Sequence, residues 1–197
     1  MDAIILAAGN SRRFGENKLL YETEGKPMYR HILDHLIELF QMNRLKTIVF
    51  VTQYDTILAH LKENHPYVNA IKNERPDLGI SHSIALGMEE LKRRNPSSMA
   101  CLFTVADQPY LKRDSLESLL KEWKKSPKGI LVCANGQRMG NPVIFSNDYY
   151  EELSNLFGDV GGKQVVKRHR EDVSLVQIQE KELMDIDVKE VLDEKKE

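Results

Sequence analysis

The stretch Leu6-Ala7-Ala8-Gly9-Asn10-Ser11-Arg12-Arg13-Phe14-Gly15-Glu16-Asn17-Lys18 decides the predicted fold, because it places a small-residue loop directly after a strand. The preceding run, Ala3 to Ala7, is continuously apolar, which is typical of a strand covered on both faces. Open α/β sheets bind their ligands beyond the carboxyl ends of such strands. Successive backbone N–H groups of a loop built from small residues can cradle phosphate oxygens, and Arg13 and Lys18 add positive charge. The stretch therefore predicts a phosphate-binding loop.

This loop differs from two common nucleotide-binding motifs. It is not a P-loop, because Gly15 is followed by Glu16 and no Gly-Lys-Ser/Thr sequence occurs. It also lacks the glycine spacing of the dinucleotide fingerprint, since Ser11 and Phe14 stand where glycines are required. The structural alternative is an ordinary strand-to-loop turn with solvated charges.

Working outward, short β-rich runs alternate with amphipathic helical segments, which predicts a mostly parallel sheet with helices on both faces. The expected class is α/β, a Rossmann-like three-layer sandwich with a mixed-sheet extension in its late part. The expected buried strands are Ala3 to Ala7, Thr47 to Thr52, Ala100 to Val105 and Gly129 to Cys133. The expected helices are Pro27 to Phe40, Ser83 to Arg94 and Asp114 to Lys125. Asn135-Gly136 predicts a turn, and Pro142 to Phe145 a strand antiparallel to its predecessor.

Composition narrows the class of protein. With 197 residues, 41% of them hydrophobic and 29% charged, the chain is expected to form one folded domain over residues 1–193, followed by a charged tail at 194–197. The formal net charge of −2 gives no overall field that would attract nucleic acid. No segment approaches the ~20 apolar residues of a membrane span. Cys101 and Cys133 are far apart inside apolar runs, which favours core positions in a reducing, cytoplasmic compartment.

The second chemical feature is Asp107, which comes directly after the apolar run ending at Val105. If this strand is parallel to the first one, Asp107 lies at the same edge of the sheet as the glycine loop. Carboxylate oxygens are the ligands that Mg²⁺ prefers, and the ion completes its shell with water and substrate phosphates. Pro109 restricts the turn that presents the carboxylate. The structural alternative for Asp107 is a turn or cap residue.

Together these motifs resemble the MobA-like NTP transferases. The pattern Leu-Ala-Ala-Gly-x-Ser-x-Arg-Phe-Gly-x-x-Lys, continued by Gly25-Lys26-Pro27, looks like the signature of that family, and Ala106-Asp107-Gln108-Pro109 is similar to its metal-binding motif. The Ala-Ala-Gly form, rather than Ala-Gly-Gly, is similar to the molybdenum cofactor cytidylyltransferase (MocA-like) branch. The resemblance implies Arg13, Lys18 and Asp107 as catalytic residues and Asp107 as the Mg²⁺ ligand. The implied nucleotide-binding residues are Leu6, Ala7, Ala8, Gly9, Ser11, Arg13, Lys18, Gly79, Ser81 and Ser83.

Four later segments continue the resemblance. Gly79 to Ile84 is similar to the family segment beside the base and ribose, although without the family Ser81 or Ser83 is most simply a helix N-cap. Gly140-Asn141-Pro142-Val143 matches a family stretch and implies Asn141 at the acceptor, with a turn leading into a strand as the alternative.

In the Gly158 to Lys163 segment, Lys163 replaces the family arginine as an acceptor contact, and Asp159 is either a second metal ligand or a helix cap. Met184 to Val188 resembles the family's Asp-Ile-Asp-Thr-Pro segment, but Val188 and Lys189 replace Thr-Pro. Asp187 is better interpreted as a helix cap, with a metal role open.

These features predict an Mg²⁺-dependent nucleotidyltransferase. By resemblance, it transfers CMP from CTP to molybdopterin cofactor with release of pyrophosphate, and a molybdenum hydroxylase apoenzyme is an implied partner. Nucleic acid and membranes are not expected partners. The alternatives are a nucleotidyltransferase acting on a sugar phosphate or another small phosphate, a dinucleotide-binding oxidoreductase, and a non-catalytic nucleotide-binding accessory protein.

Overall fold

The computed structural model describes residues 1–9, 14 and 17–186, and its main feature is a seven-stranded sheet with the strand order β5-β4-β1-β6-β8-β7-β9. The strands are β1 Asp2–Ala7, β4 Ile48–Thr52, β5 Asn69–Lys72, β6 Ala100–Val105, β7 Ile130–Asn135, β8 Arg138–Ser146 and β9 Val173–Gln177. The α-helices are α1 Met28–Gln41, α2 Asp55–Asn64, α3 Ile80–Arg94, α4 Arg113–Trp123, α5 Tyr150–Ser154 and α6 Lys163–Arg168. A small hairpin, β2 Glu22–Thr23 and β3 Lys26–Pro27, precedes α1.

The direction of the strands confirms the predicted mixed sheet. β5, β4, β1 and β6 run parallel, whereas β8 is antiparallel to both β6 and β7, and β9 is parallel to β7. The chain leaves β1 toward β4 and β5 on one side and returns to β6 on the other side. Strand order thus reverses between β1 and β6, and the carboxyl ends of these two strands form the crevice where such sheets bind ligands.

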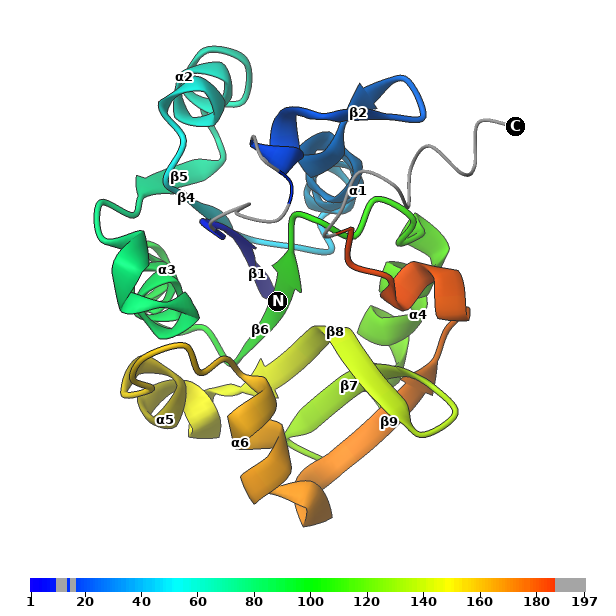
Figure 1. Cartoon of the computed structure of the whole chain (residues 1–197). Helices are drawn as coiled ribbons and strands as arrows, with labels where there is room; N and C mark the ends of the chain where they lie inside the picture. Colours follow the sequence, from blue (N-terminus) through cyan, green and yellow to red (C-terminus); the bar gives the residue numbers. More distant parts are fainter. Residues whose placement is uncertain (10–13, 15–16, 187–197) are drawn as a thin grey trace.

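Helices cover both faces of the sheet, as Figure 1 shows for α3, α5 and α6 on one face and for α1 and α4 on the other. Each face has its own hydrophobic core. One core joins α1, α2 and α4 to the sheet, and the other joins α3, α5 and α6. β1 contributes to both, with Ile5 in the first core and Ile4 in the second, and both side chains are fully buried. The three-layer α/β class predicted from the sequence is confirmed.

Most element bounds agree with the prediction to within two residues, and three differ for a physical reason. α3 begins at Ile80, three residues before the predicted Ser83, because Gly79 with a φ of 85° serves as its N-cap. The turn between β7 and β8 is centred on Gly136 and Gln137, one position later than expected, since Asn135 pairs with Arg138. β8 begins at Arg138 rather than Pro142.

The segment Gly140-Asn141-Pro142-Val143 is consequently part of β8, so its reading as a turn before a strand is wrong. Strand β8 is irregular here, with a register shift opposite Val132 and Cys133 and a cis peptide bond between Asn141 and Pro142. Both cysteines lie in the core as predicted. Burial raises the pKa of the Cys133 thiol to about 12 and that of Cys101 well above its usual value, so neither thiol ionises near neutral pH.

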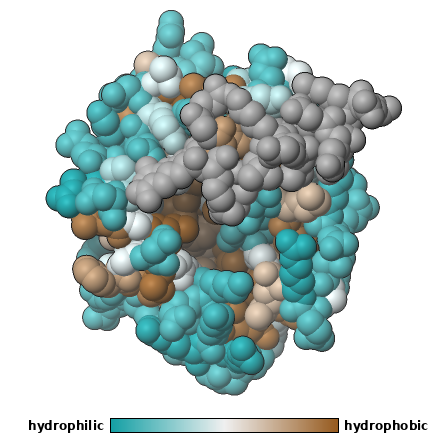
Figure 2. Space-filling view, in the orientation of Figure 1, coloured by the Kyte–Doolittle hydropathy of each residue, from teal (hydrophilic) through white to brown (hydrophobic). Residues whose placement is uncertain are grey.

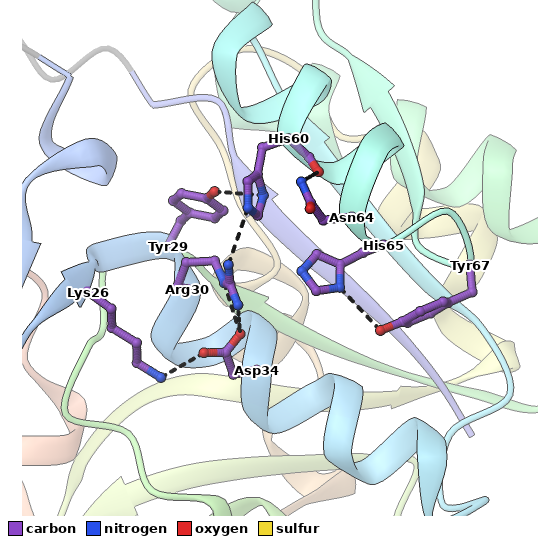
Figure 3. A network of polar contacts seen from close by, with 8 residues as sticks. All are labelled: Lys26, Tyr29, Arg30, Asp34, His60, Asn64, His65 and Tyr67. Carbon is purple, nitrogen blue, oxygen red and sulfur yellow. Dashed lines mark hydrogen bonds and ion pairs between the residues drawn. The ribbon is translucent and has the colours of Figure 1, made fainter.

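A network of polar contacts, drawn in Figure 3, fixes α2 against α1. His60 of α2 contacts the hydroxyl of Tyr29 through Nδ1 (3.1 Å) and Arg30 through Nε2 (3.3 Å), and Arg30 also donates to Asp34 (2.9 Å). Burial acts to raise the pKa of Asp34, but the hydrogen bonds from Lys26 and Arg30 outweigh it and hold that pKa below its usual value. This network holds α2 against α1. The first residue of α2, Asp55, directly follows Thr52, Gln53 and Tyr54, whose side chains donate to the carbonyls of the glycine loop.

In the part of the chain that the structure describes, no helix has the length and apolar character needed to cross a membrane.

Candidate functional site

The carboxyl ends of four parallel strands meet at one edge of the sheet. Ala7 of β1 lies opposite Thr52 of β4, and Thr52 lies opposite Lys72 of β5. On the other side, Leu6 lies opposite Val105 of β6, and the backbone N–H of Ala106 donates to the carbonyl of Leu6 (3.1 Å). The glycine loop and Asp107 therefore leave the sheet side by side. Figure 2 shows this face of the molecule hollowed at its centre, with hydrophobic residues on the floor of the hollow.

The start of the glycine loop is held by the last residue of β4 and the two residues after it. The donors are Thr52 Oγ1 to the carbonyl of Ala7 (3.0 Å), Gln53 Nε2 to that of Ala8 (3.0 Å) and Tyr54 Oη to that of Gly9 (2.8 Å). Three successive carbonyl groups thus face β4. With their carbonyls fixed in this way, the loop can present N–H groups to an anion instead.

The middle of the loop lies outside the described residues. Ser11 and Arg13, predicted as nucleotide-binding residues, are therefore not placed. The chain is described again at Phe14, which is buried with Met28 and Ile186 in a small hydrophobic cluster, and from Asn17 onward.

Lys18 and Asp107 are brought together although they are 89 residues apart in sequence. The Lys18 Nζ atom lies 2.6 Å from Oδ2 of Asp107, and their side chains are 10% and 22% exposed. Asn17 positions the lysine locally, because its side chain accepts a hydrogen bond from the N–H of Leu19 (3.1 Å) and caps the 3₁₀ turn Lys18–Leu20. Two predicted catalytic residues thus form one ion pair at the topological switch point.

A carboxylate oxygen of this pair fits a divalent cation. Asp107 Oδ1 is buried and has no hydrogen-bond partner among the described residues. An unpartnered buried oxygen is costly, and carboxylate oxygens are ligands of Mg²⁺. The described residues contain no group of three His, Cys, Asp or Glu side chains able to hold a metal. Water and substrate phosphates commonly complete the shell of an ion held by a carboxylate such as that of Asp107.

The predicted base and ribose segment forms the beginning of α3. Ser81 and Ser83 are buried inside the first turn of this helix, and neither caps it, so the N-cap interpretation is wrong. Ser83 instead accepts a hydrogen bond through Oγ from Nδ2 of Asn73 (2.9 Å), and the N–H of Asn73 donates to the carbonyl of Thr52 (2.8 Å). Asn73 thereby ties the end of β5 to the start of α3.

Gly79 is required where α3 meets the Gly158-Asp159 loop. With φ at +85°, a Cβ added to Gly79 would lie 2.5 Å from the carbonyl oxygen of Gly158, and that carbonyl accepts a hydrogen bond from the N–H of Ser81 (3.4 Å). Asp159 is exposed in this loop. It does not cap the following helix, because α6 begins at Lys163 with Gly162 as its N-cap. The cap interpretation of Asp159 is wrong, and its role as a second metal ligand stays a prediction.

Gly79→Ala is expected to lower the free energy of unfolding by about 2 kcal/mol or more, because a positive φ alone costs an L-residue roughly 1–2 kcal/mol and the methyl group would displace Gly158. Gly136→Ala is the matched control, since Gly136 also has a positive φ but an added Cβ has nothing within 4 Å. Urea unfolding of both variants measures the difference. Equal losses of stability would show that the contact with Gly158 is unimportant.

The predicted acceptor residues line a cavity of about 310 Å³. Asn141 of β8 and Lys163 at the start of α6 both lie on its wall, together with Gln108 and Asp185. The cavity opens beside the candidate metal ligand, because the N–H of Ile186, the residue after Asp185, donates to the carbonyl of Asp107 (3.0 Å). The Met184 to Val188 segment is thereby placed at the site up to Ile186, whereas Asp187 lies outside the described residues.

Three residues of this site did not stand out in the sequence: Gln53, Tyr54 and Asn73. Each is a polar residue within two positions of the end of a parallel strand, on the same edge as the glycine loop. That position was the available signal for Gln53 and Tyr54, since the strand ending at Thr52 was predicted. β5 was not predicted, because it is a short, half-exposed strand without a continuous apolar run.

Comparisons with known proteins agree with this geometry. The model of the MobA-like NTP transferase domain matches residues 3–173. A protein of Pyrococcus horikoshii named "Probable molybdenum cofactor guanylyltransferase" is 27% identical over 169 residues, which cover 84% of this chain and 75% of that protein.

Solved structures give the same fold. The crystal structure of Rv0371c from Mycobacterium tuberculosis superimposes with a TM-score of 0.81 at 20% identity and covers 98% of each chain. Its complex with manganese gives a TM-score of 0.71 at 19% identity, covering 90% of this chain and 87% of that one. Because the family model spans most of the sequence, this chain belongs to the MobA-like NTP transferases and is a nucleotidyltransferase.

Proposed function

We propose that this nucleotidyltransferase transfers CMP from CTP to the phosphate of a molybdopterin-type cofactor, with a divalent cation, Mg²⁺, as its cofactor. The observation that carries the proposal is the pairing of Lys18 with Asp107 (2.6 Å) beside the glycine loop at the switch point of the sheet. This pair offers one cation for the α phosphate and one carboxylate for the metal. The family is one of transferases, so the oxidoreductase alternative is dropped.

In this reaction an oxygen of the acceptor phosphate attacks the α phosphorus in line. The new P–O bond forms as the bond to the bridging oxygen of the β phosphate breaks, and pyrophosphate leaves with the electron pair. The backbone of Ala8 and Gly9 orients the triphosphate, and Lys18 stabilises the charge that grows on the α phosphate. Asp107 would hold the divalent cation, which when bound would supply further charge neutralisation on the phosphates. No protein nucleophile is needed.

Support for CTP comes from the glycine loop. Ala8 carries a methyl group where the guanylyl branch of the family has glycine, and this residue is buried next to Gln53. A methyl group at this point leaves less room for a purine, which favours a pyrimidine. The Pyrococcus relative is named a guanylyltransferase, so GTP is the decisive competitor.

CTP is therefore expected to support turnover with a kcat/KM at least roughly tenfold above those of GTP and ATP, because a wrong base leaves buried polar groups unpaired. Pyrophosphate release is measured with each nucleotide, with molybdopterin as acceptor, and with Mg²⁺ or with a chelator. Ala8→Gly is the matched variant and is expected to raise the rate with GTP relative to CTP.

The other outcomes of this assay separate the alternatives. Faster turnover with GTP would overturn the cytidylyl assignment and leave the nucleotidyl transfer intact. Turnover only with a sugar phosphate would identify the rival acceptor class. Tight CTP binding without pyrophosphate release from any acceptor would favour a non-catalytic nucleotide-binding protein. Turnover that persists in the presence of the chelator would show that the reaction does not require a divalent cation.

A further inference from the structure

Gln108 is a buried polar residue to which neither the sequence nor the proposed reaction assigns a role. It follows Asp107 at the end of β6, is 2% exposed, and lines the cavity that holds Asn141 and Lys163. Its Oε1 atom has no hydrogen-bond partner among the described residues. Leaving a buried polar group unpaired costs about 1–3 kcal/mol. Such a group in a protein of this family is expected to find its partner in a ligand.

The position of Gln108 points to the acceptor rather than to the nucleotide. Asp107 and Ile186 are joined by a backbone hydrogen bond, and the chain neighbours of both, Gln108 and Asp185, line the same cavity. The cavity therefore begins next to the candidate metal ligand and extends toward β8 and α6. A molecule whose phosphate faces Lys18 and Asp107 would place its remaining part in this cavity, against the Gln108 amide.

The side chains that line the cavity indicate the chemical class of the acceptor. Four of them, Val132, Met139, Val143 and Leu183, are apolar. The apolar face of a flat ring packs on these four side chains, which could not pair with the hydroxyls of a polyol, while its polar edge meets the polar side chains of the same cavity, Gln108, Arg138, Asn141, Lys163 and Asp185. A carboxamide carries a donor and an acceptor side by side, and it pairs with a ring edge that carries an N–H next to a C=O.

We infer that Gln108 selects the acceptor by pairing its carboxamide with the lactam edge of a phosphorylated heterocycle in this cavity. The inference rests on the nucleotidyl transfer proposed above and adds to it the residue that distinguishes a heterocyclic phosphate from a sugar phosphate. Gln108 touches the acceptor, and Asp107 and Lys18 act on the nucleotide.

Gln108→Leu tests this assignment, because leucine keeps the approximate volume of the side chain and removes both hydrogen-bonding groups. The kcat/KM for molybdopterin is expected to fall about 10–100-fold, the equivalent of one lost hydrogen bond to a buried group. The KM for CTP is expected to stay unchanged. The preference for molybdopterin over glucose 1-phosphate should shrink by a similar factor. Gln137→Leu, the same exchange at an exposed turn residue, is the control and should change none of these values.

Thermal unfolding distinguishes acceptor recognition from a structural role. Removing an unpaired amide from a buried position should leave Tm unchanged or raise it. A marked fall in Tm, or failure to fold, would show that the amide serves the fold and would overturn the inference. An unchanged KM for molybdopterin, or an equal rise in the KM for CTP, would overturn it as well.

Equilibrium dialysis of molybdopterin separates this inference from the proposed function. If the wild-type protein binds molybdopterin but releases no pyrophosphate, the proposed reaction fails while weaker binding by Gln108→Leu still supports acceptor recognition. If both proteins bind molybdopterin equally, Gln108 does not read the acceptor, whatever the outcome of the turnover assay.

Discussion

Asp107→Asn is expected to abolish pyrophosphate release, lowering kcat by about 10³-fold or more. Neutralisation of phosphate charge by a bound metal is worth several kcal/mol in the transition state, and each 1.36 kcal/mol corresponds to about a factor of ten. The asparagine amide can still accept the hydrogen bond from Lys18, so the local packing is retained. It has no negative charge to hold the cation, and its N–H₂ group cannot be a ligand. Steady-state pyrophosphate release in saturating CTP and Mg²⁺ measures the loss.

The control for this variant is Asp114→Asn, which makes the same exchange on a side chain that is 89% exposed at the start of α4. It should retain wild-type activity. Titration with Mn²⁺ in the presence of CTP adds a second readout, in which Asp107→Asn should bind the metal more weakly than the wild type. A correctly folded Asp107→Asn variant with near wild-type turnover would remove Asp107 from the metal site.

Lys18→Met is expected to lower kcat by about 10²–10³-fold, the loss seen when one charge-stabilising donor is removed from a transition state. The change in KM for CTP should be smaller, because the negative charge on the α phosphate grows as the reaction proceeds. Methionine retains the apolar stem of the side chain, which is 10% exposed, and removes only the ammonium group. Single-turnover measurement of CTP consumption separates the chemical step from product release.

Lys121→Met, on a side chain that is 69% exposed in α4, is the matched control. Lys18→Met should bind Mn²⁺ with CTP no more weakly than the wild type, since its Asp107 keeps its charge and loses a competing cation. This opposite behaviour of the two variants distinguishes the roles of the paired residues. If Lys18→Met instead raises only the KM for CTP, Lys18 stabilises bound CTP and the transition state equally, and its proposed role in the chemical step is wrong.

The ion pair of Lys18 with Asp107 also has a consequence for substrate binding. At 2.6 Å the two groups neutralise each other in a partly buried place. In the proposed complex the Lys18 ammonium would contact the α phosphate and the Asp107 carboxylate would bind the divalent cation. Each of the two charged groups would thus replace the other with a substrate group or the cation as its partner. The site therefore needs no unpaired buried charge before the nucleotide and metal arrive, which would be costly.

Local sequence patterns are sufficient to predict the strands at the centre of the sheet and the helices packed on them. β1, β4 and β6 are continuous apolar runs because both of their faces are buried, and α1 shows its buried stripe at helical spacing. Because these strands are parallel, the residues after them share one edge. That rule is enough to place Asp107 beside the glycine loop from the sequence alone.

Which side chains meet at that edge depends on how distant segments of the chain pack together. Lys18 reaches Asp107 across 89 residues, Asn73 binds Ser83, and Gln108 faces the cavity formed with β8 and α6. The start of α3 was likewise fixed by a glycine contact with a loop 79 residues later rather than by a serine cap. Local patterns record burial and turn preference, whereas these contacts depend on the register and packing of segments distant in the chain, to which no local pattern corresponds.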